Sequence, residues 1–229
     1  MRAIVCGANG AMGKLIQNRL QAEVAGLVSI DGENGVPKTF AELGNVGADV
    51  IIDFSHHSAI EAVMEYAKAQ NCAVVVGTTG HTEEEKTVIH AAAQQIPVFF
   101  SGNMSLGIAV LCRLAKQAAA VFPDADVEIV ESHHNQKLDA PSGTALMIRD
   151  ALISANPKLS ADRISICSVR VGKLFGEHEV IFANNRDEFV TYKHQVTSRE
   201  PFADGAISVA KWILSQPCGL YGMGDFCDF

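Results

Sequence analysis

Short apolar runs alternate with helix-like segments through the first hundred residues of the chain. The runs are continuous, as in strands that a parallel sheet buries on both faces. Between them, apolar residues recur at the spacing of amphipathic helices. The predicted strands cover residues 2–6, 26–30, 50–54, 73–76 and 98–100, and the predicted helices cover 12–22, 59–69 and 82–95. This order predicts a doubly wound parallel α/β sheet with right-handed crossovers.

Capping and turn residues mark the ends of several of these elements. Ser58 stands where it could cap the helix at 59–69, and Thr82 with Glu85 matches a capping box. Residues 31–38 are rich in Gly and contain Asn and Pro, so we expect a loop after the second strand.

The pattern changes near residue 104. The last three predicted strands alternate apolar and polar residues, which suits a sheet with one exposed face. We therefore expect an α/β domain of residues 1–104 with 200–229, and an α+β domain of residues 105–199 with an open, largely antiparallel or mixed sheet. The later elements are helices at 106–121, 145–155 and 202–214, strands at 126–131, 164–171, 177–184 and 188–196, and a looped tail at 219–226.

Composition limits the classes of partner. The 229 residues are 48% hydrophobic and 19% charged, with a formal net charge of -8, so a folded core is expected and nucleic acid or an anionic membrane surface is not. No apolar run reaches the ~18 residues of a membrane-spanning helix, and no secretory signal pattern precedes the first strand. The six cysteines form no C-x-x-C pair, as expected of reduced thiols in a cytoplasmic protein.

A glycine run connects the first strand to the first helix. In this context Gly7 permits a tight turn, Gly10 lets backbone N–H groups approach a pyrophosphate, and Gly13 lets the helix pack closely on the sheet. The first domain is therefore predicted to be a Rossmann-like dinucleotide-binding domain. The predicted cofactor residues in this loop are Gly7, Ala8, Asn9, Gly10, Ala11 and Met12.

Asp31 is placed to distinguish the two nicotinamide cofactors. An acidic residue at the end of the second strand accepts hydrogen bonds from a ribose diol and repels a 2′-phosphate. Lys38 is close enough in sequence to swing towards such a phosphate. We expect NADH or NADPH, with a preference for NADH.

Small polar loops follow two more strands of the same sheet. Ligands of such folds bind beyond the carboxyl ends of the strands, so both loops are predicted to contact the nicotinamide ribose or amide. They comprise Gly77, Thr78 and Thr79, and Ser101, Gly102, Asn103 and Met104. A third strand end carries His56 and His57, which we interpret as solvated loop residues.

Residues 131–144 gather two histidines and a lysine before a helix start. His133 and His134 would point to opposite sides of a continuing strand, which argues against a shared metal ion, and no zinc-ligand spacing accompanies them. Lys137 has no acidic residue placed to neutralise it on a helix face. If Pro141 lies in the first helical turn, the next three residues would offer backbone N–H groups and hydroxyls to an anion. These residues are Ser142, Gly143 and Thr144.

The motif Glu131-x-His-His-x-x-Lys-x-Asp-Ala-Pro-Ser-Gly-Thr144 resembles that of the 4-hydroxy-tetrahydrodipicolinate reductases, also called dihydrodipicolinate reductases. The resemblance extends over nearly the whole chain. It implies a cytoplasmic, homotetrameric, NAD(P)H-dependent enzyme of the diaminopimelate route to lysine, with residues 105–199 binding substrate and forming the oligomer. Gly32 stands where an arginine able to hold a 2′-phosphate can occur in the family.

The resemblance also implies roles for individual residues. His133 would be the catalytic proton donor or acceptor and Lys137 a proton donor, while His134, Gly143 and Thr144 would contact a cyclic dicarboxylate. No metal is implied. Two alternatives stay open on the residues alone: another Rossmann dehydrogenase acting on a small amino or imino acid, and a non-catalytic NAD(H)-binding sensor.

Overall fold

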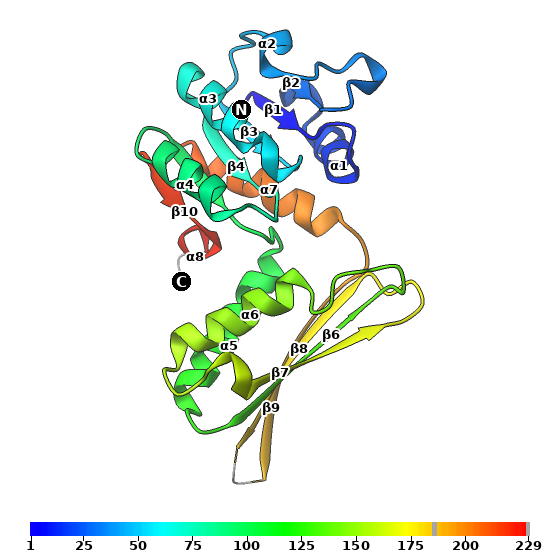
Figure 1. Cartoon of the computed structure of the whole chain (residues 1–229), viewed down its shortest axis with the longest axis vertical. Coiled ribbons are helices and arrows are strands. Elements are labelled where there is room, and N and C mark those ends of the chain that lie inside the picture. Colours follow the sequence, from blue (N-terminus) through cyan, green and yellow to red (C-terminus); the bar gives the residue numbers. More distant parts are fainter. Residues whose placement is uncertain (185–186, 228–229) are drawn as a thin grey trace. The chain divides into compact units, whose positions relative to one another are not determined.

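The chain divides into two units, Met1–Met104 with Glu200–Phe229, and Ser105–Arg199. The structure is a computed structural model that describes residues 1–184 and 187–227. Each unit contains one sheet and its own helices (Figure 1). Among the described residues, no helix combines the length and apolar character needed to cross a membrane.

The first unit is built on a parallel sheet with strand order β10-β5-β4-β3-β1-β2. Every residue of β1, β3 and β4 is buried, which explains their uninterrupted apolar sequences. The predicted doubly wound parallel sheet is therefore confirmed. The strands are β1 (Ala3–Cys6), β2 (Val24–Val28), β3 (Val50–Asp53), β4 (Ala73–Val76), β5 (Pro97–Phe100) and β10 (Gly219–Tyr221).

Helices cover both faces of this sheet and bury alternate side chains of each strand. On one face, α2, α3 and α4 pack against residues such as Ile4 and Ile51. On the other, α1 and α7 pack against residues such as Val5 and Ile52. The helices are α1 (Ala11–Leu20), α2 (Phe40–Leu43), α3 (Ile60–Gln70), α4 (Glu83–Ala92), α7 (Glu200–Ile213) and α8 (Met223–Phe226).

Local expectations for this unit are partly corrected. The capping box of Thr82 and Glu85 is present at the start of α4. Ser58 does not cap α3; it lies in a short 3-10 helix, and its N–H donates to the ring of His56. The tail is not a loop, because residues 219–221 pair in parallel with β5. A three-residue strand is too short to show a sequence period, so this pairing is decided by the tertiary fold.

The second unit has a mixed sheet of strand order β7-β6-β8-β9. The β6–β7 pair is parallel, and the β6–β8 and β8–β9 pairs are antiparallel, which confirms the predicted mixed sheet. Helices α5 and α6 pack on one face (Figure 1). The elements are α5 (Leu106–Val121), β6 (Asp126–His133), α6 (Gly143–Ala155), β7 (Ile164–Arg170), β8 (Gly176–Asn184) and β9 (Glu188–Val196).

The inner face of this second sheet changes character along the strands. Near the start of β6, Val127 and Ile129 are buried in an apolar core with α5 and α6. Further along the same face, Glu131 is buried and His133 is half-buried. A buried carboxylate requires partners, so this end of the inner face is where chemistry is expected. On the opposite face Val169 and Phe189 are exposed by 37% and 71%.

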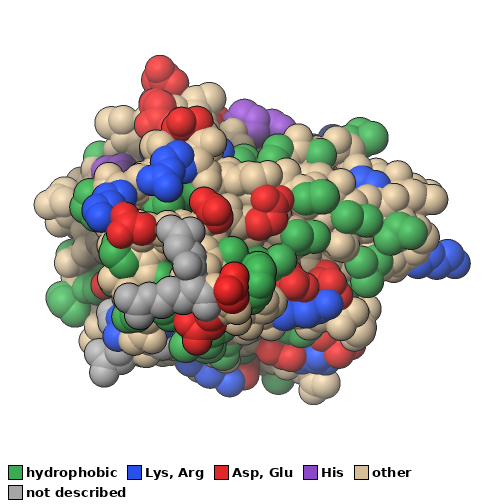
Figure 2. Space-filling view, turned by 90° about the horizontal axis from the view of Figure 1, so that it is seen from below, with side chains coloured by type: hydrophobic (Ala, Val, Ile, Leu, Met, Phe, Trp, Pro, Cys, Tyr) green, Lys and Arg blue, Asp and Glu red, His purple; other side chains and the backbone are tan. Residues whose placement is uncertain are grey.

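Figure 2 shows acidic, basic and hydrophobic side chains interspersed over one side of the molecule.

Candidate active site

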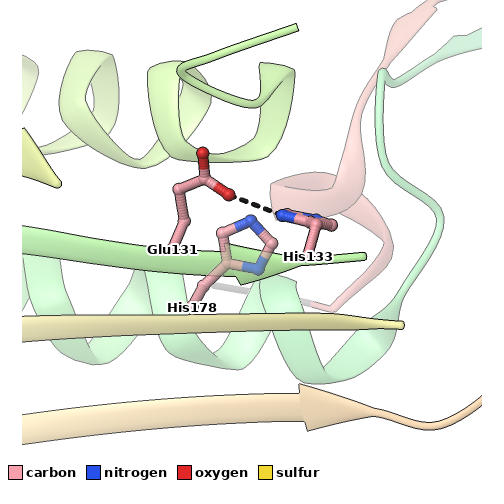
Figure 3. A group of neighbouring side chains, drawn as sticks. All are labelled: Glu131, His133 and His178. Carbon is pink, nitrogen blue, oxygen red and sulfur yellow. Dashed lines mark hydrogen bonds and ion pairs between the residues drawn. The ribbon is translucent and has the colours of Figure 1, made fainter. Parts of the chain in front are cut away.

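Strand pairing brings five polar side chains together at the polar end of the inner face. Glu131 and His133 share one face of β6 because they are two residues apart in a strand. In register, Glu131 pairs with Ser168 on β7 and with His178 on β8, and His133 pairs with Arg170. Figure 3 shows Glu131, His133 and His178 projecting into one cluster.

Glu131 is the centre of this cluster. Its carboxylate accepts hydrogen bonds from Arg170 Nη1 at 2.9 Å, from Arg170 Nη2 at 2.7 Å and from the Ser142 N–H at 3.3 Å. Burial raises the pKa of the Glu131 carboxyl, but the hydrogen bonds from Arg170, Ser168 and His133 outweigh it and lower the pKa to about 2. Glu131 is therefore an anion at neutral pH.

The ionised Glu131 determines which nitrogen of His133 carries a proton. His133 Nδ1 lies 2.5 Å from Glu131 Oε2, and an ionised carboxylate can only accept, so Nδ1 donates. The other nitrogen, Nε2, is left for proton exchange. A Cβ atom added at Gly176 would lie 3.4 Å from Nε2, so the glycine keeps that side of the ring open.

Burial lowers the pKa of His133, and the charges of Lys137 and Arg170 act in the same direction. Glu131 opposes this shift without outweighing it. The neutral form of the unliganded imidazole is therefore favoured, and the ring becomes a stronger base when an anionic ligand arrives.

His178 supports the cluster from the neighbouring strand. Its Nε2 lies 3.1 Å from Ser142 Oγ, and its ring centroid lies 5.2 Å from that of His133. Burial, followed by the charge of His133, lowers the pKa of His178 to about 4, so this ring is neutral at pH 7. We expect it to orient its neighbours and not to carry charge.

Lys137 lies in the loop that connects β6 to α6. Its Nζ donates to Asp139 Oδ1 at 2.8 Å, so an acidic residue does neutralise it, from the loop and not from a helix face. Burial raises the pKa of the Asp139 carboxyl, but the hydrogen bond from Lys137 outweighs it and lowers the pKa below the usual range. The pair arises from a loop contact two residues apart, which a helix-face argument does not consider. His134, at the end of the strand, is half-buried.

Helix α6 begins at Gly143, two residues after the proline that was expected in its first turn. Ser142 is the N-cap, and its hydroxyl accepts from the N–H of Ala145 at 3.2 Å; Pro141 lies outside the helix. The Ser142 side chain is buried, and both its N–H and its hydroxyl have protein partners. Gly143 and Thr144 form the first turn, where backbone N–H groups favour an anion.

The cluster also contains a set of possible metal ligands. Glu131, His133 and His178 each offer one donor atom, and these three atoms lie within 4.8 Å of one another. Among the described residues, this group has the spacing of metal ligands. Both Glu131 oxygens, however, face the guanidinium of Arg170, whose positive charge would lie beside a bound cation. The donor set therefore fits a proton relay better than a metal ion.

Arg170 and His178 had no role assigned from the sequence. Each occupies an inward position of its strand; the other buried residues of β8 are apolar or glycine, and the other inward residues of β7 are Ile164, Ile166 and the small polar Ser168. A polar residue that interrupts an alternating pattern on the buried side is the signal that could have found them.

The glycine loop has the geometry of a phosphate-binding turn. Gly7 has φ +79°, and a Cβ atom there would lie 2.3 Å from the carbonyl oxygen of Phe54. A Cβ atom at Gly13 would lie 2.2 Å from the carbonyl oxygen of Gly7. Gly10 is the N-cap of α1, and Ala11 and Met12 begin the helix. The loop therefore lies directly at a helix N-terminus, where anions are favoured.

Asp31 lies beside this loop, in a turn three residues after β2 and not at the end of the strand. Its Oδ1 accepts from Asn9 Nδ2 at 2.5 Å and from the Glu33 N–H at 3.0 Å. The Asn9 hydrogen bond is the main reason that the pKa of Asp31 is lowered. The aliphatic stem of Lys38 lies against Gly32, where a Cβ atom would be 2.3 Å from Lys38 Cε.

A cavity of about 120 Å³ adjoins the glycine loop, and its wall includes Gly7, Val28, Ile30 and Lys38. It lies near the carboxyl ends of β1 and β2, with Ala8 buried at the start of the loop. A mostly apolar cavity beside a phosphate-binding turn fits the adenosine end of a dinucleotide. The residues present thus suit such a cofactor.

Two further loops lie at the carboxyl ends of β4 and β5. Gly77, Thr78 and Thr79 follow β4, and the Thr78 hydroxyl donates to the buried Asp53 at 2.8 Å. Ser101, Gly102, Asn103 and Met104 follow β5, and Ser101 Oγ donates to the Asn103 carbonyl at 2.8 Å. Neighbouring parallel strands end at one sheet edge, so these loops share an edge with the glycine loop.

Of the two histidines after β3, His56 is exposed as expected, but His57 is half-buried and contacts a carboxylate. His57 Nδ1 lies 2.8 Å from Glu85 Oε1, and the ring centroids of His56 and His57 are 4.1 Å apart. His57 thereby ties the 3-10 turn before α3 to the capping box of α4.

The first unit has the architecture of a dinucleotide-binding domain, and the second is an α+β unit carrying a buried histidine–carboxylate cluster. Family models for the N-terminus and the C-terminus of dihydrodipicolinate reductase match residues 1–104 and 107–227. The chain belongs to the dihydrodipicolinate reductase family.

Individual relatives agree with this membership, and a solved structure shares the fold. The 4-hydroxy-tetrahydrodipicolinate reductase of Caldanaerobacter subterraneus subsp. tengcongensis is 42% identical over 246 residues, covering 98% of this chain and 97% of that protein. The Campylobacter concisus enzyme of that name is 37% identical, covering 96% and 95%. A dipicolinate-bound dihydrodipicolinate reductase from Paenisporosarcina sp. TG-14 superposes with a TM-score of 0.82 at 23% identity, covering 98% of each chain, which shows the fold.

Proposed function

We propose that the protein is a 4-hydroxy-tetrahydrodipicolinate reductase, an NAD(P)H-dependent oxidoreductase of diaminopimelate and lysine biosynthesis. The observation that carries this proposal is the identity of 42% over nearly the full length of a reductase of that name. The residue cluster around His133 is chemically suited to the same reaction. The reaction uses one hydride and one proton and releases the substrate hydroxyl as water.

We assign substrate binding to the segment from His134 to Thr144. The substrate is a cyclic dicarboxylate, and a structural neighbour was solved with the planar dicarboxylate dipicolinate bound. The first-turn amides of Gly143 and Thr144 and the side chain of His134 would take a carboxylate. For Ser142, predicted as a substrate contact, we propose a supporting role: its buried hydroxyl and N–H fix the helix start that presents these amides.

We assign proton transfer to His133 and Lys137. Loss of the substrate hydroxyl as water leaves a conjugated imine. Hydride addition to its ring carbon then moves negative charge towards the ring nitrogen and gives an enamine that must be protonated. Lys137 supplies a cation and a proton, and His133 exchanges a proton at Nε2 while Glu131 holds Nδ1. The dianionic substrate raises the pKa of His133, which favours the protonated imidazole when the proton is needed.

We assign the first unit, residues 1–104 with 200–229, to cofactor binding. A bound nicotinamide cofactor supplies the hydride. The glycine loop from Gly7 to Met12 would hold the pyrophosphate, Asp31 the ribose diol, and the loops at 77–79 and 101–104 the nicotinamide end. The Asp31 carboxylate disfavours a 2′-phosphate, so NADH is the preferred cofactor.

We assign residues 105–199 to oligomerisation as well as to substrate binding. The outer face of the second sheet exposes Val169 and Phe189, which a monomer would leave in water. A homotetramer that buries this face is the proposed assembly, and the cytoplasm is the proposed location. Light scattering on the purified protein gives the mass directly.

One assay tests the proposed activity. The protein is mixed with NADH or NADPH and freshly generated 4-hydroxy-tetrahydrodipicolinate, and absorbance is followed at about 340 nm, where reduced nicotinamides absorb. Oxidation of the cofactor only with that substrate, inhibited competitively by dipicolinate, is expected. Turnover with other amino or imino acids instead would indicate another dehydrogenase, and cofactor binding without turnover would indicate a sensor.

A further inference from the structure

We propose that Arg170 is a positioning residue of the active site, which fixes Glu131, and through it His133, against the loop that carries Lys137. This inference rests on the proposed function for its kinetic consequences. Its structural basis is a set of contacts that one guanidinium makes to two different segments of the second unit.

The first contact set holds the carboxylate that orients His133. Nη1 and Nη2 of Arg170 each donate to a different oxygen of Glu131, at 2.9 Å and 2.7 Å. A two-point contact between planar groups fixes both position and rotation of the carboxylate. Because Glu131 Oε2 is also the acceptor for His133 Nδ1, the plane of the carboxylate determines the direction of the imidazole.

The second contact reaches the lysine loop. Arg170 Nη2 also donates to the backbone carbonyl of Asp139 at 2.7 Å. The side chain of the same Asp139 accepts from Lys137 Nζ at 2.8 Å. Arg170 therefore connects the strand that carries His133 to the residue that holds Lys137, the two groups proposed to supply proton and charge.

Burial makes these contacts strong. The Arg170 side chain is 17% exposed, and the side chain of Glu131 is fully buried. Within the part of the chain that the structure describes, the Nε atom of Arg170 is buried without a hydrogen-bond partner. Removing the guanidinium would leave a buried carboxylate with one of its charged partners missing, so the cluster must rearrange.

Several charged or titratable groups face His133, and they decide what a substitution does to it. Glu131 on β6 is the anion, Arg170 on β7 and Lys137 in the loop are the cations, and His178 on β8 is a neutral ring with His194 behind it on β9. Removing Arg170 takes away a cation, which raises the pKa of His133. Removing the charge of Glu131 takes away the anion, which lowers it.

The test compares Arg170→Met, Arg170→Lys and Glu131→Gln with Arg163→Met as the matched control. Arg163 lies just before the opposite end of β7, and its guanidinium donates to the Lys158 carbonyl. Arg170→Met is expected to lower kcat by about 10²-fold, the scale of a misplaced reacting group, with a smaller change in KM. Arg170→Lys keeps the charge without the two-point contact and is expected to recover only part of the loss.

Two readouts separate positioning from general damage. In the pH profile of kcat/KM, the alkaline limb should move to higher pH in Arg170→Met and to lower pH in Glu131→Gln. Histidine NMR titration of the unliganded protein should show the same opposite shifts at His133, whether or not a variant turns over. Far-UV circular dichroism checks that each variant is folded. If Arg170→Met does not fold, Arg170→Lys is used for both readouts in its place.

The two proposals fail in distinguishable ways. If the wild-type protein does not turn over 4-hydroxy-tetrahydrodipicolinate, the proposed function is wrong, and the NMR titration still tests the contact. If the wild type is active and Arg170→Met matches Arg163→Met in kcat and in the His133 titration, the positioning role is wrong.

Discussion

Glu131 Oε2 lies 2.5 Å from His133 Nδ1, and both side chains project from one face of the same strand. The carboxylate is fully buried at the end of an otherwise apolar core, and Arg170 holds it ionised. The result is an imidazole with one nitrogen committed to the protein and the other available for chemistry. This arrangement and its surroundings lead to five predictions.

The first prediction concerns the two proton-transfer residues. His133→Ala and Lys137→Ala are each expected to lower kcat by about 10²–10⁴-fold, because assistance by a positioned acid or base has that size. Steady-state kinetics on folded variants measures the effect, with Lys116→Ala as control, an exposed lysine on α5 in the same unit. Near-normal turnover in either active-site variant would remove that residue from the mechanism.

The second prediction concerns the cap of α6. Ser142→Ala removes the acceptor of the Ala145 N–H and the partner of His178, so a loss of about 1 kcal/mol from the cap alone is expected. The helix start also presents the proposed substrate amides, so KM should rise. Urea unfolding and kinetics are compared with Ser154→Ala, an exposed serine in the last turn of α6. Equal stability in the two variants would contradict the capping role.

The third prediction concerns stability in acid. The pKa of His178 is lowered from 6.5 to about 4 in the folded protein, so the unfolded chain binds more protons between these values. Stability is therefore lost as pH falls from 6.5 towards 4, by up to about 3 kcal/mol. The pKa of Glu131 is lowered from 4.5 to about 2, so its contribution is lost at lower pH, between these two values.

Denaturant unfolding at a series of pH values separates the two windows. His178→Asn should flatten the dependence between pH 6.5 and 4, and Glu131→Gln should flatten it between 4.5 and 2. An unchanged slope in the upper window for His178→Asn would show that the buried ring does not titrate as described.

The fourth prediction separates the fold and cofactor roles of the glycine loop. Gly13→Ala places a Cβ atom 2.2 Å from the Gly7 carbonyl oxygen, so a loss of about 1–3 kcal/mol in stability is expected. Gly10→Ala meets its nearest atom at 3.2 Å and should fold with a smaller loss while still weakening NADH binding. Thermal unfolding and NADH titration give the two quantities, and equal stability losses would refute the distinction.

The fifth prediction concerns cofactor choice. Asp31→Asn removes the charge that repels a 2′-phosphate and weakens the acceptor for a ribose diol, so the ratio of kcat/KM for NADH to that for NADPH should fall by about 10-fold or more. Lys38→Met should weaken NADPH use and leave NADH use nearly unchanged. A ratio that stays constant in both variants would place cofactor selection elsewhere in the chain.

The sequence predicts more of the fold than of the site. Continuous apolar strands predict the parallel sheet, because burial on both faces leaves a local sequence pattern. Capping residues such as Thr82 likewise predict where helices begin. The short strand at Gly219–Tyr221 was missed, since only pairing with β5 makes it a strand. The glycine loop was placed correctly between β1 and α1, whereas the salt bridge of Lys137 with Asp139 was not foreseen.

By itself, the sequence determined the family and predicted the residues proposed to carry the chemistry, because glycine positions, strand periods and the motif from Glu131 to Thr144 are local properties of the chain. Only the tertiary structure decided that Arg170 and His178, distant in sequence, complete the cluster around Glu131 and His133. The physical reason is register: hydrogen bonding between β6, β7 and β8 places these side chains in adjacent rows on one face. The alternation of residues along one strand shows which side chains share a face, but it does not specify which residues of the neighbouring strands lie beside them.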